Sequence, residues 1–167
     1  VGLQMSQEGA ENDDQRASRK GEASKIEAVA YSPDGRSVAT ACDKYGVRIW
    51  DLSVGEVVHQ LGSPTGSQTK AVAFARDGEQ VLTGGNSKVA RVWDTFSHGV
   101  FSCRYDGHTN VATSIAIAPD FGSFVSTGFD QSVRHWKVGE KEGQGKQIGK
   151  CPALITCCGY HRGARYV

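Results

Sequence analysis

Three tryptophans are spaced at a constant interval along the chain. Trp50, Trp93 and Trp136 lie 43 residues apart. Short segments upstream of them keep the same interval without a gap: AVAY at 28–31, AVAF at 71–74 and SIAI at 114–117. Self-similarity at one fixed period indicates a supersecondary unit copied in tandem, each copy burying its apolar faces against its neighbours. The repeat therefore constrains the scaffold strongly and the partner very little.

Composition and charge exclude several classes of function. A formal net charge of +1 gives no electrostatic reason to expect nucleic acid or an anionic membrane as a partner. No apolar run approaches the roughly 18 to 20 residues that span a bilayer, and no secretory segment stands near the start. Five cysteines is an odd number, and their positions suit strands better than a disulfide framework. We therefore expect free thiols, Cys42 and Cys103 among them, and an intracellular location, cytoplasmic or nuclear.

The two ends of the chain suggest a piece of a longer protein. The sequence begins with Val1 and ends with Val167, inside an expected strand. Residues 1–24 differ from the rest, because charged side chains are frequent and Met5 is the one large apolar residue between 4 and 24. Such a stretch buries too little apolar surface to offset its ordering entropy, so we expect a disordered lead-in to the repeats.

Each repeat reads as four short strands with a turn signal between them. SPDG at 32–35 favours a turn, since proline presets φ and glycine accepts a positive φ. With 21 glycines and frequent breaks, no window is long enough for a helix. The chain is therefore expected to be all-β. The expected strands are 26–31, 37–42, 47–51 and 56–61; 69–75, 79–85, 88–94 and 99–104; and 112–118, 122–128, 132–137 and 146–150.

The ends of the third strands carry a family resemblance. RIWD at 48–51, RVWD at 91–94 and RHWK at 134–137 resemble the strand ending that names the WD-repeat β-propeller family. DGH at 106–108 resembles the Gly-His element of that family. The resemblance implies β-propeller blades of four antiparallel strands in an incomplete ring, with about three blades and the first strand of a fourth. The expected domain is 25–167, with repeats near 25–68, 69–111 and 112–153 and a truncated fourth at 154–167.

The third repeat contains a set of residues that imitates a catalytic triad. Under the resemblance, His108, Ser126, Asp130 and Trp136 form a buried network in which Asp holds His, His reaches the Ser hydroxyl, and Ser meets the indole N–H. An acyl-transfer reading is disfavoured because Ser126 has no Gly-x-Ser-x-Gly elbow to project its oxygen. We therefore expect a structural network and no catalytic residue.

Residues near the end of the chain raise the question of a zinc site. Cys151, Cys157, Cys158 and His161 lie close together in sequence. Structural zinc sites usually bring their ligands in tight pairs such as Cys-x2-Cys, and this spacing differs. Adjacent strand residues also point to opposite faces, so Cys157 and Cys158 cannot easily share one metal. Small strand residues are the better interpretation, and we expect neither a metal nor a cofactor.

The resemblance places the binding surface on the top face, where loops vary on a rigid scaffold. Tyr45 and Phe129 are the expected hot spots, because exposed aromatic side chains contribute disproportionately to binding. The alternative is that either ring packs against a neighbouring blade. The full set of expected partner-binding residues is Lys44, Tyr45, Lys88, Phe129 and Gln131.

Three blades also fall short of a closed ring, since propellers usually have four to eight. Open blade edges would then pair with further blades or associate with one another. We expect a non-catalytic scaffold that binds other proteins or peptides and neither nucleic acid nor membrane. Two alternatives stay open: the propeller part of an enzyme whose catalytic domain lies elsewhere, and a reader of modified peptides, which would need an aromatic cage.

Overall fold

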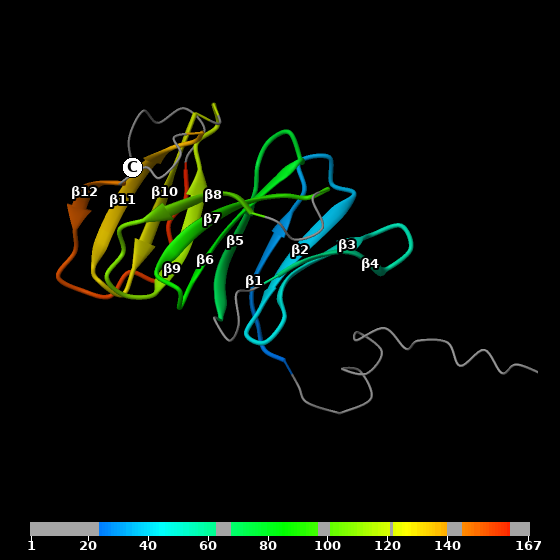
Figure 1. The fold of residues 1–167 in the computed structure, drawn as a ribbon, viewed down its shortest axis with the longest axis horizontal. Coiled ribbons are helices and arrows are strands. Elements are labelled where there is room, and N and C mark those ends of the chain that lie inside the picture. Colours follow the sequence, from blue (N-terminus) through cyan, green and yellow to red (C-terminus); the bar gives the residue numbers. More distant parts are fainter. Residues whose placement is uncertain (1–23, 63–67, 97–100, 121, 140–144, 161–167) are drawn as a thin grey trace, which may run out of the picture.

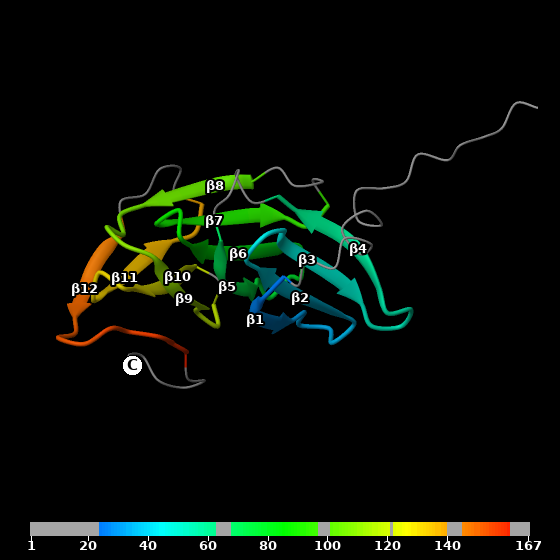
Figure 2. The same ribbon diagram turned by 90° about the horizontal axis from the view of Figure 1, so that it is seen from below.

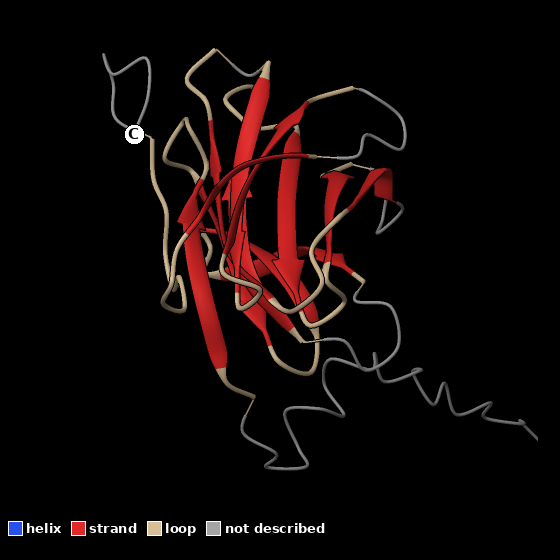
Figure 3. Cartoon of the chain, turned by 90° about the vertical axis from the view of Figure 1, so that its left-hand side faces the viewer, coloured by secondary structure: helices blue, strands red, loops and turns tan. Residues whose placement is uncertain are grey.

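The computed structural model describes residues 24–62, 68–96, 101–120, 122–139 and 145–160. These residues form twelve β-strands and no helix, as Figures 1 and 3 show. The strands make three antiparallel sheets, or blades, in which consecutive strands are neighbours. Blade 1 is β1 (Ile26–Tyr31), β2 (Ser37–Cys42), β3 (Gly46–Asp51) and β4 (Glu56–Leu61); blade 2 is β5 (Thr69–Phe74), β6 (Gln80–Gly85), β7 (Val89–Asp94) and β8 (Phe101–Asp106); blade 3 is β9 (Ala112–Ile117), β10 (Ser123–Gly128), β11 (Ser132–Lys137) and β12 (Lys146–Lys150).

The strand predictions are confirmed for all three blades. Each predicted strand corresponds to an observed one, and the largest displacement is in β8, which begins and ends two residues later than expected. The connection between β7 and β8 is one residue longer than the equivalent connection in blade 1, because Trp93 pairs with Phe101 whereas Trp50 pairs with Val57. The β-bulge between Val92 and Trp93 has an equivalent between Ile49 and Trp50 in blade 1, so the bulge is common to these two blades and the longer connection is not.

The turns after the first strand of each blade have one mechanism. Asp34 and Asp77 each accept a hydrogen bond at Oδ1 from the backbone N–H two residues on, over 3.0 and 2.9 Å, and Asp120 does the same at 3.1 Å. Gly35 and Gly78 follow the first two of these aspartates with φ near +70° and +75°. An aspartate that bonds its own turn and a glycine with positive φ explain why the sheet reverses here.

The hydrophobic core lies between the blades. The inner strands β1, β5 and β9 are neighbours, as Figure 2 shows. Each core cluster joins two blades, so each blade needs the next to cover its apolar face. The first cluster is Ala39, Ala41, Val47, Ile49 and Leu61 with Val72, Val81 and Trp93; the second is Ala71, Leu82, Ala90, Val92 and Tyr105 with Ile115, Phe124 and Trp136.

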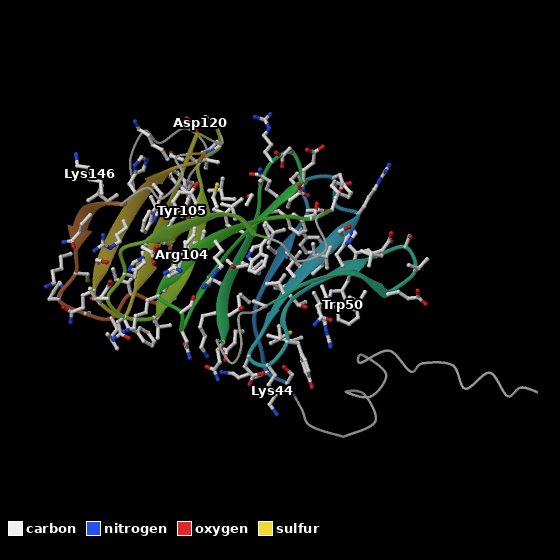
Figure 4. The ribbon with its side chains drawn as sticks, in the orientation of Figure 1. Lys44, Trp50, Arg104, Tyr105, Asp120 and Lys146 are labelled. Carbon is white, nitrogen blue, oxygen red and sulfur yellow. The ribbon has the colours of Figure 1, made fainter. Side chains whose placement is uncertain are left out.

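The blades have two ends, which we name by their turns. The top face carries the turns 43–45, 86–88 and 129–131, between the second and third strands of each blade. The bottom face carries the turns 32–36, 75–79 and 118–122, between the first and second strands. Figure 4 shows Lys44 and Asp120, one from each set, at opposite ends of the strands.

The segment 154–160 differs from its prediction as a strand, because it forms no ladder. It nevertheless lies against β9, as β9 lies against β5. Thr113 Oγ1 donates a hydrogen bond to the carbonyl of Ile155 over 2.6 Å, and the Cys158 N–H donates to Ser114 Oγ over 3.1 Å. The inner strand of a blade pairs with the second strand of its own blade, and the described residues contain no second strand for this segment.

The face of β1 that points away from blade 2 is exposed. We call it the leading face of blade 1, made of Ile26, Val29 and Tyr31, which are 59%, 61% and 69% exposed. Val72 and Ile115 occupy the positions of blades 2 and 3 that are equivalent to Val29, and both are buried. They are covered by the preceding blade, whereas the described residues provide no blade in front of blade 1.

Candidate functional site

The four residues of the apparent triad form one hydrogen-bonded chain inside blade 3. His108 precedes β9, Asp130 lies in the turn between β10 and β11, and Ser126 and Trp136 lie on those strands. His108 Nδ1 is 2.9 Å from Asp130 Oδ2, and its Nε2 is 2.6 Å from Ser126 Oγ. The Trp136 indole N–H donates to the same Ser126 Oγ over 2.8 Å. The sequence therefore brings together residues from three separate segments.

Asp130 is the acceptor that ends this chain. Burial raises the pKa of its carboxyl, but hydrogen bonds from the Ser132 hydroxyl, the Thr109 and Ser132 N–H groups and His108 together lower it to about 2. The carboxylate is therefore charged at neutral pH. Ser132 donates to it over 2.7 Å and Thr109 over 2.9 Å, so Asp130 ties the turn after β10 to the loop before β9.

His108 takes one tautomer in this arrangement. Its side chain has no exposed area, and burial lowers its pKa against the opposing effect of Asp130. A neutral ring donates from Nδ1 to Asp130 and accepts from the Ser126 hydroxyl at Nε2, while Ser126 Oγ accepts from Trp136. The donor and acceptor roles of the two ring nitrogens and of Ser126 Oγ are thus all satisfied within the network.

The same geometry argues against nucleophilic chemistry at Ser126. Ser126 is 0% exposed, and its Oγ is already hydrogen-bonded to both His108 and Trp136. An attacking hydroxyl must stand about 3 Å from a substrate carbonyl in a site open to that substrate. What this arrangement does is hold the top-face turn of blade 3 to the sheet.

Blades 1 and 2 keep only the inner part of the network. The Trp50 indole donates to Thr40 Oγ1 over 2.9 Å, and the Trp93 indole donates to Thr83 Oγ1 over 2.7 Å. In blade 1, Asp43 stands one position early and accepts from the Ser24 hydroxyl over 2.7 Å. Different side chains therefore perform the same tethering of the top-face turn.

A backbone bond makes the tether common to all three blades. The N–H of Asp43, Asn86 and Phe129 donates to the carbonyl of the residue 18 positions earlier, over 2.9–3.1 Å. In blade 2 the Asn86 side chain also donates to Gln68 Oε1 over 3.1 Å. The top face is therefore a set of loops fixed to a rigid sheet.

The predicted partner-binding residues all lie in these top-face turns. Phe129 is 39% exposed. Lys44 and Lys88 are exposed, and Gln131 is half-buried. Lys88 and Gln131 have φ of 62° and 64°, a left-handed backbone that L side chains adopt infrequently.

Tyr45 is arranged differently from Phe129. It is half-buried, and the guanidinium carbon of Arg48 lies 4.6 Å from the centre of its ring. This cation–π contact is within blade 1, so the ring packs against a side chain of its own blade. Phe129 is therefore the more available of the two aromatic side chains.

Sequence reasoning missed a groove of about 490 Å³ on the bottom face, between blades 1 and 2. Ile49 and Phe74 lie within it, and Val58 and Phe96 line it with exposed fractions of 46% and 66%. Four carboxylates also line it. Its acidic residues fall in expected turns and strands, and the one feature of the sequence that could have indicated the groove is Phe96, an aromatic residue between two expected strands.

The cysteines form no metal site among the described residues. All five are free thiols, with Cys42 buried and Cys157 exposed. No group of three or more His, Cys, Asp or Glu side chains in the described ranges could hold a metal ion. His161, part of the zinc alternative, lies outside the described residues. Nor does any helix in the described part of the chain have the length and apolarity to cross a bilayer.

Comparison with known proteins agrees with this architecture. The family model of the WD40 domain of anaphase-promoting complex subunit 4 matches residues 13–77, and that of the WD domain G-beta repeat matches 99–137. The crystal structure of RRP9 WD40 repeats and the structure of U3-55K are similar, with TM-scores of 0.66 and 0.64. Each is 24% identical in sequence to this chain, over 73% of it.

The chain spans 38% of the length of each of these two structures. No curated protein sequence matches it. The two family models describe WD40 repeats, they match different parts of the chain, and the solved structures share the arrangement of the sheets. The chain belongs to the WD-repeat β-propeller family.

Proposed function

We propose that the protein is a non-catalytic scaffold that binds other proteins or peptides through its top face. The observation that supports this is the position of Phe129. Its ring is 39% exposed, while the next residue, Asp130, is held by four hydrogen bonds inside the blade. An exposed aromatic side chain on a preorganised turn loses little conformational entropy on binding.

The neighbouring residues extend this surface. Lys44, Lys88 and Gln131 occupy equivalent turns of the three blades, and Lys44 and Lys88 add positive charge. Binding energy would be concentrated on Phe129, with Tyr45 presenting one edge beside Arg48. The free thiols of all five cysteines support placing the protein in a reducing, intracellular compartment.

The test is quantitative affinity capture with two variants of the chain. Wild-type protein and the double variant Tyr45→Ala/Phe129→Ala are compared with Ile148→Ala, which removes an exposed side chain from β12, away from the top-face turns. We expect a set of proteins to be retained by the wild type and by Ile148→Ala and lost from the double variant. Identical retention by all three would refute a top-face binding site.

We further propose that the leading face of blade 1 is a second contact surface, which packs against another blade. Where a blade precedes, the equivalent positions Val72 and Ile115 are 8% and 7% exposed, against 61% for Val29. The opposite end of the array is different. There, Ser114 and His135 stand where blade 1 has Ala28 and Ile49, and residues 154–160 cover β9.

This asymmetry determines how copies of the chain would associate. The leading face exposes three large apolar side chains, so the leading face of one copy matches the leading face of a second copy better than it matches the partly polar face of blade 3. Such a contact is isologous and stops at the dimer. We expect sedimentation velocity to show dimers, Val29→Lys to be monomeric, and the control Leu52→Lys to dimerise. Open-ended oligomers, or a wild type that is monomeric at every concentration, would contradict the proposal.

A further inference from the structure

The groove on the bottom face arises from a local difference between the two gaps in the array. In the gap between blades 2 and 3, Tyr105 is fully buried, and its hydroxyl accepts a hydrogen bond from the Gly139 N–H over 3.1 Å. Leu61 takes the place of Tyr105 in the first gap, since it pairs with Val47 as Tyr105 pairs with Ala90. A leucine has no hydroxyl and cannot make the equivalent hydrogen bond between the blades.

The residue that takes the place of Gly139 also differs between the two gaps. Phe96 stands 43 residues before Gly139, and in place of a closed turn it presents a ring that is 66% exposed. His59 from β4 meets this ring edge-on, with the ring centres 6.1 Å apart. The first gap is therefore open at the bottom, with an aromatic wall formed by Phe74 and Phe96.

The rim of the groove is acidic. Asp34, Asp51, Asp77 and Glu79 line it, against the single guanidinium of Arg76. The Ser32 hydroxyl and the Arg36 N–H lower the pKa of Asp34, and the hydroxyl and N–H of Ser53 lower that of Asp51. These carboxylates are charged at neutral pH. Apolar walls with charge of one sign at the rim select a ligand that is apolar in the middle and oppositely charged at its flanks.

We propose that this groove binds a basic linear peptide of a partner protein, with one aliphatic or aromatic side chain flanked by Lys or Arg. The central side chain would lie between Phe74 and Phe96. The flanking cations would contact Asp77 and Glu79 on one side and Asp34 on the other. A volume of about 490 Å³ is in the usual range of ligand sites. This surface is at the opposite end of the blades from the top-face site and is independent of it.

The equivalent gap provides an internal comparison. Between blades 2 and 3, Gly122 and Gly139 stand in the places of Glu79 and Phe96. That gap keeps the turn aspartate, Asp120, but it has no carboxylate in the place of Glu79 and no ring in the place of Phe96. The two features on which binding depends therefore coincide in the first gap.

The test uses the full chain and an immobilised library of seven-residue peptides, each with one Leu, Ile, Phe or Trp between two Lys or Arg. A matched library has Glu in place of Lys and Arg. We expect retention by the basic library alone, decreasing as salt is added because the rim contacts are screened. Equal retention by both libraries, or by neither, would overturn the proposal.

Variants then assign the binding to the groove. Asp77→Asn/Glu79→Gln removes two charges while keeping side-chain shape, and we expect about a fivefold to tenfold loss of affinity. Phe96→Ala removes the exposed ring and should cost about tenfold, with an unchanged melting temperature. Asp120→Asn and Ile148→Ala are the controls, and both should bind as wild type. Loss of affinity in the controls, or none in the groove variants, would overturn the assignment.

The chain itself also contains basic segments that could compete for the groove, and the one before blade 1 is the one tested. Arg16, Arg19 and Lys20 make a basic stretch in the segment before blade 1. Binding that appears only after these three residues are replaced by Ala would assign the groove to the chain's own segment and overturn the partner proposal. Binding of equal strength with and without that substitution supports it.

Discussion

Replacing Asp130 with Ala tests the view that the polar network of blade 3 is structural. The pKa of Asp130 is about 2, against 3.8 for an unperturbed carboxyl, so the folded state favours its charged form by nearly two pKa units. At 1.36 kcal/mol per unit, the interactions of the carboxylate stabilise the fold by about 2 kcal/mol at neutral pH. The side chain is only 6% exposed, so solvent screens these interactions little.

The loss of unfolding free energy in Asp130→Ala should be about 2 kcal/mol, because His108 Nδ1 and the Ser132 hydroxyl would lose their acceptor together. Urea unfolding followed by tryptophan fluorescence measures it, and the melting temperature should fall by about 4–8 °C for a chain of this length. Asp120→Asn is the control, since that aspartate is exposed and bonds only its own turn. An Asp130→Ala protein as stable as wild type, or no less stable than Asp120→Asn, would refute the structural role.

The pH dependence of stability offers an independent check on the same network. Burial lowers the pKa of His108 in the folded state, so the unfolded chain takes up the proton first. Stability should therefore be complete above about pH 6.5 and decrease as the pH falls below it. A second loss should follow between about pH 4 and 2, as Asp130 is protonated. In His108→Asn the first loss should be absent, and a persisting loss near pH 6 would contradict the assignment.

Two further predictions concern the packing of blade 3. A Cβ at Gly145 would lie 2.4 Å from the Trp136 ring, so Gly145→Ala should destabilise the fold by about 1–3 kcal/mol in urea unfolding. Gly149→Ala is the control, because its Cβ would lie 3.9 Å from the nearest atoms and should cost little. Thr113→Val removes the bond to the Ile155 carbonyl, and hydrogen exchange should accelerate over 154–160 while the rest of blade 3 stays protected.

The repeat period predicted the strands, because strands and turns depend on local signals at fixed intervals, whereas the polar chain of blade 3 was predicted from the family resemblance. Alternating apolar residues fix a strand, and Asp-Gly turns fix where it ends. In the family that the sequence resembles, the positions of His108, Ser126 and Asp130 each have a defined place in the blade. Their meeting could therefore be predicted although they lie far apart in the sequence. The contact between Tyr45 and Arg48 was not predicted, since nothing in the sequence favours a partner within the blade over one outside it.

The bottom-face groove could not be predicted from the period, because it results from a departure from repetition. Leu61 and Tyr105 lie 44 residues apart, one more than the repeat period, because the connection between β7 and β8 is one residue longer than the connection between β3 and β4. Aligning the repeats at the fixed period compares Tyr105 with Gly62 and misses that Leu61 takes the place of Tyr105 in blade 1. Local pairing registers, and not the sequence period, identify equivalent residues in the outer strands.

The two proposed binding surfaces depend on different physical properties of one scaffold. On the top face, hydrogen bonds in every blade hold the turns in place, so variation there changes side chains and leaves the backbone fixed. On the bottom face, the space between blades depends on whether an outer-strand residue can reach across, as Tyr105 does to Gly139. Binding at the top is therefore sensitive to the network around Asp130, whereas binding at the bottom should survive its loss. A variant such as Asp130→Ala, measured against both ligands below its melting temperature, separates the two surfaces.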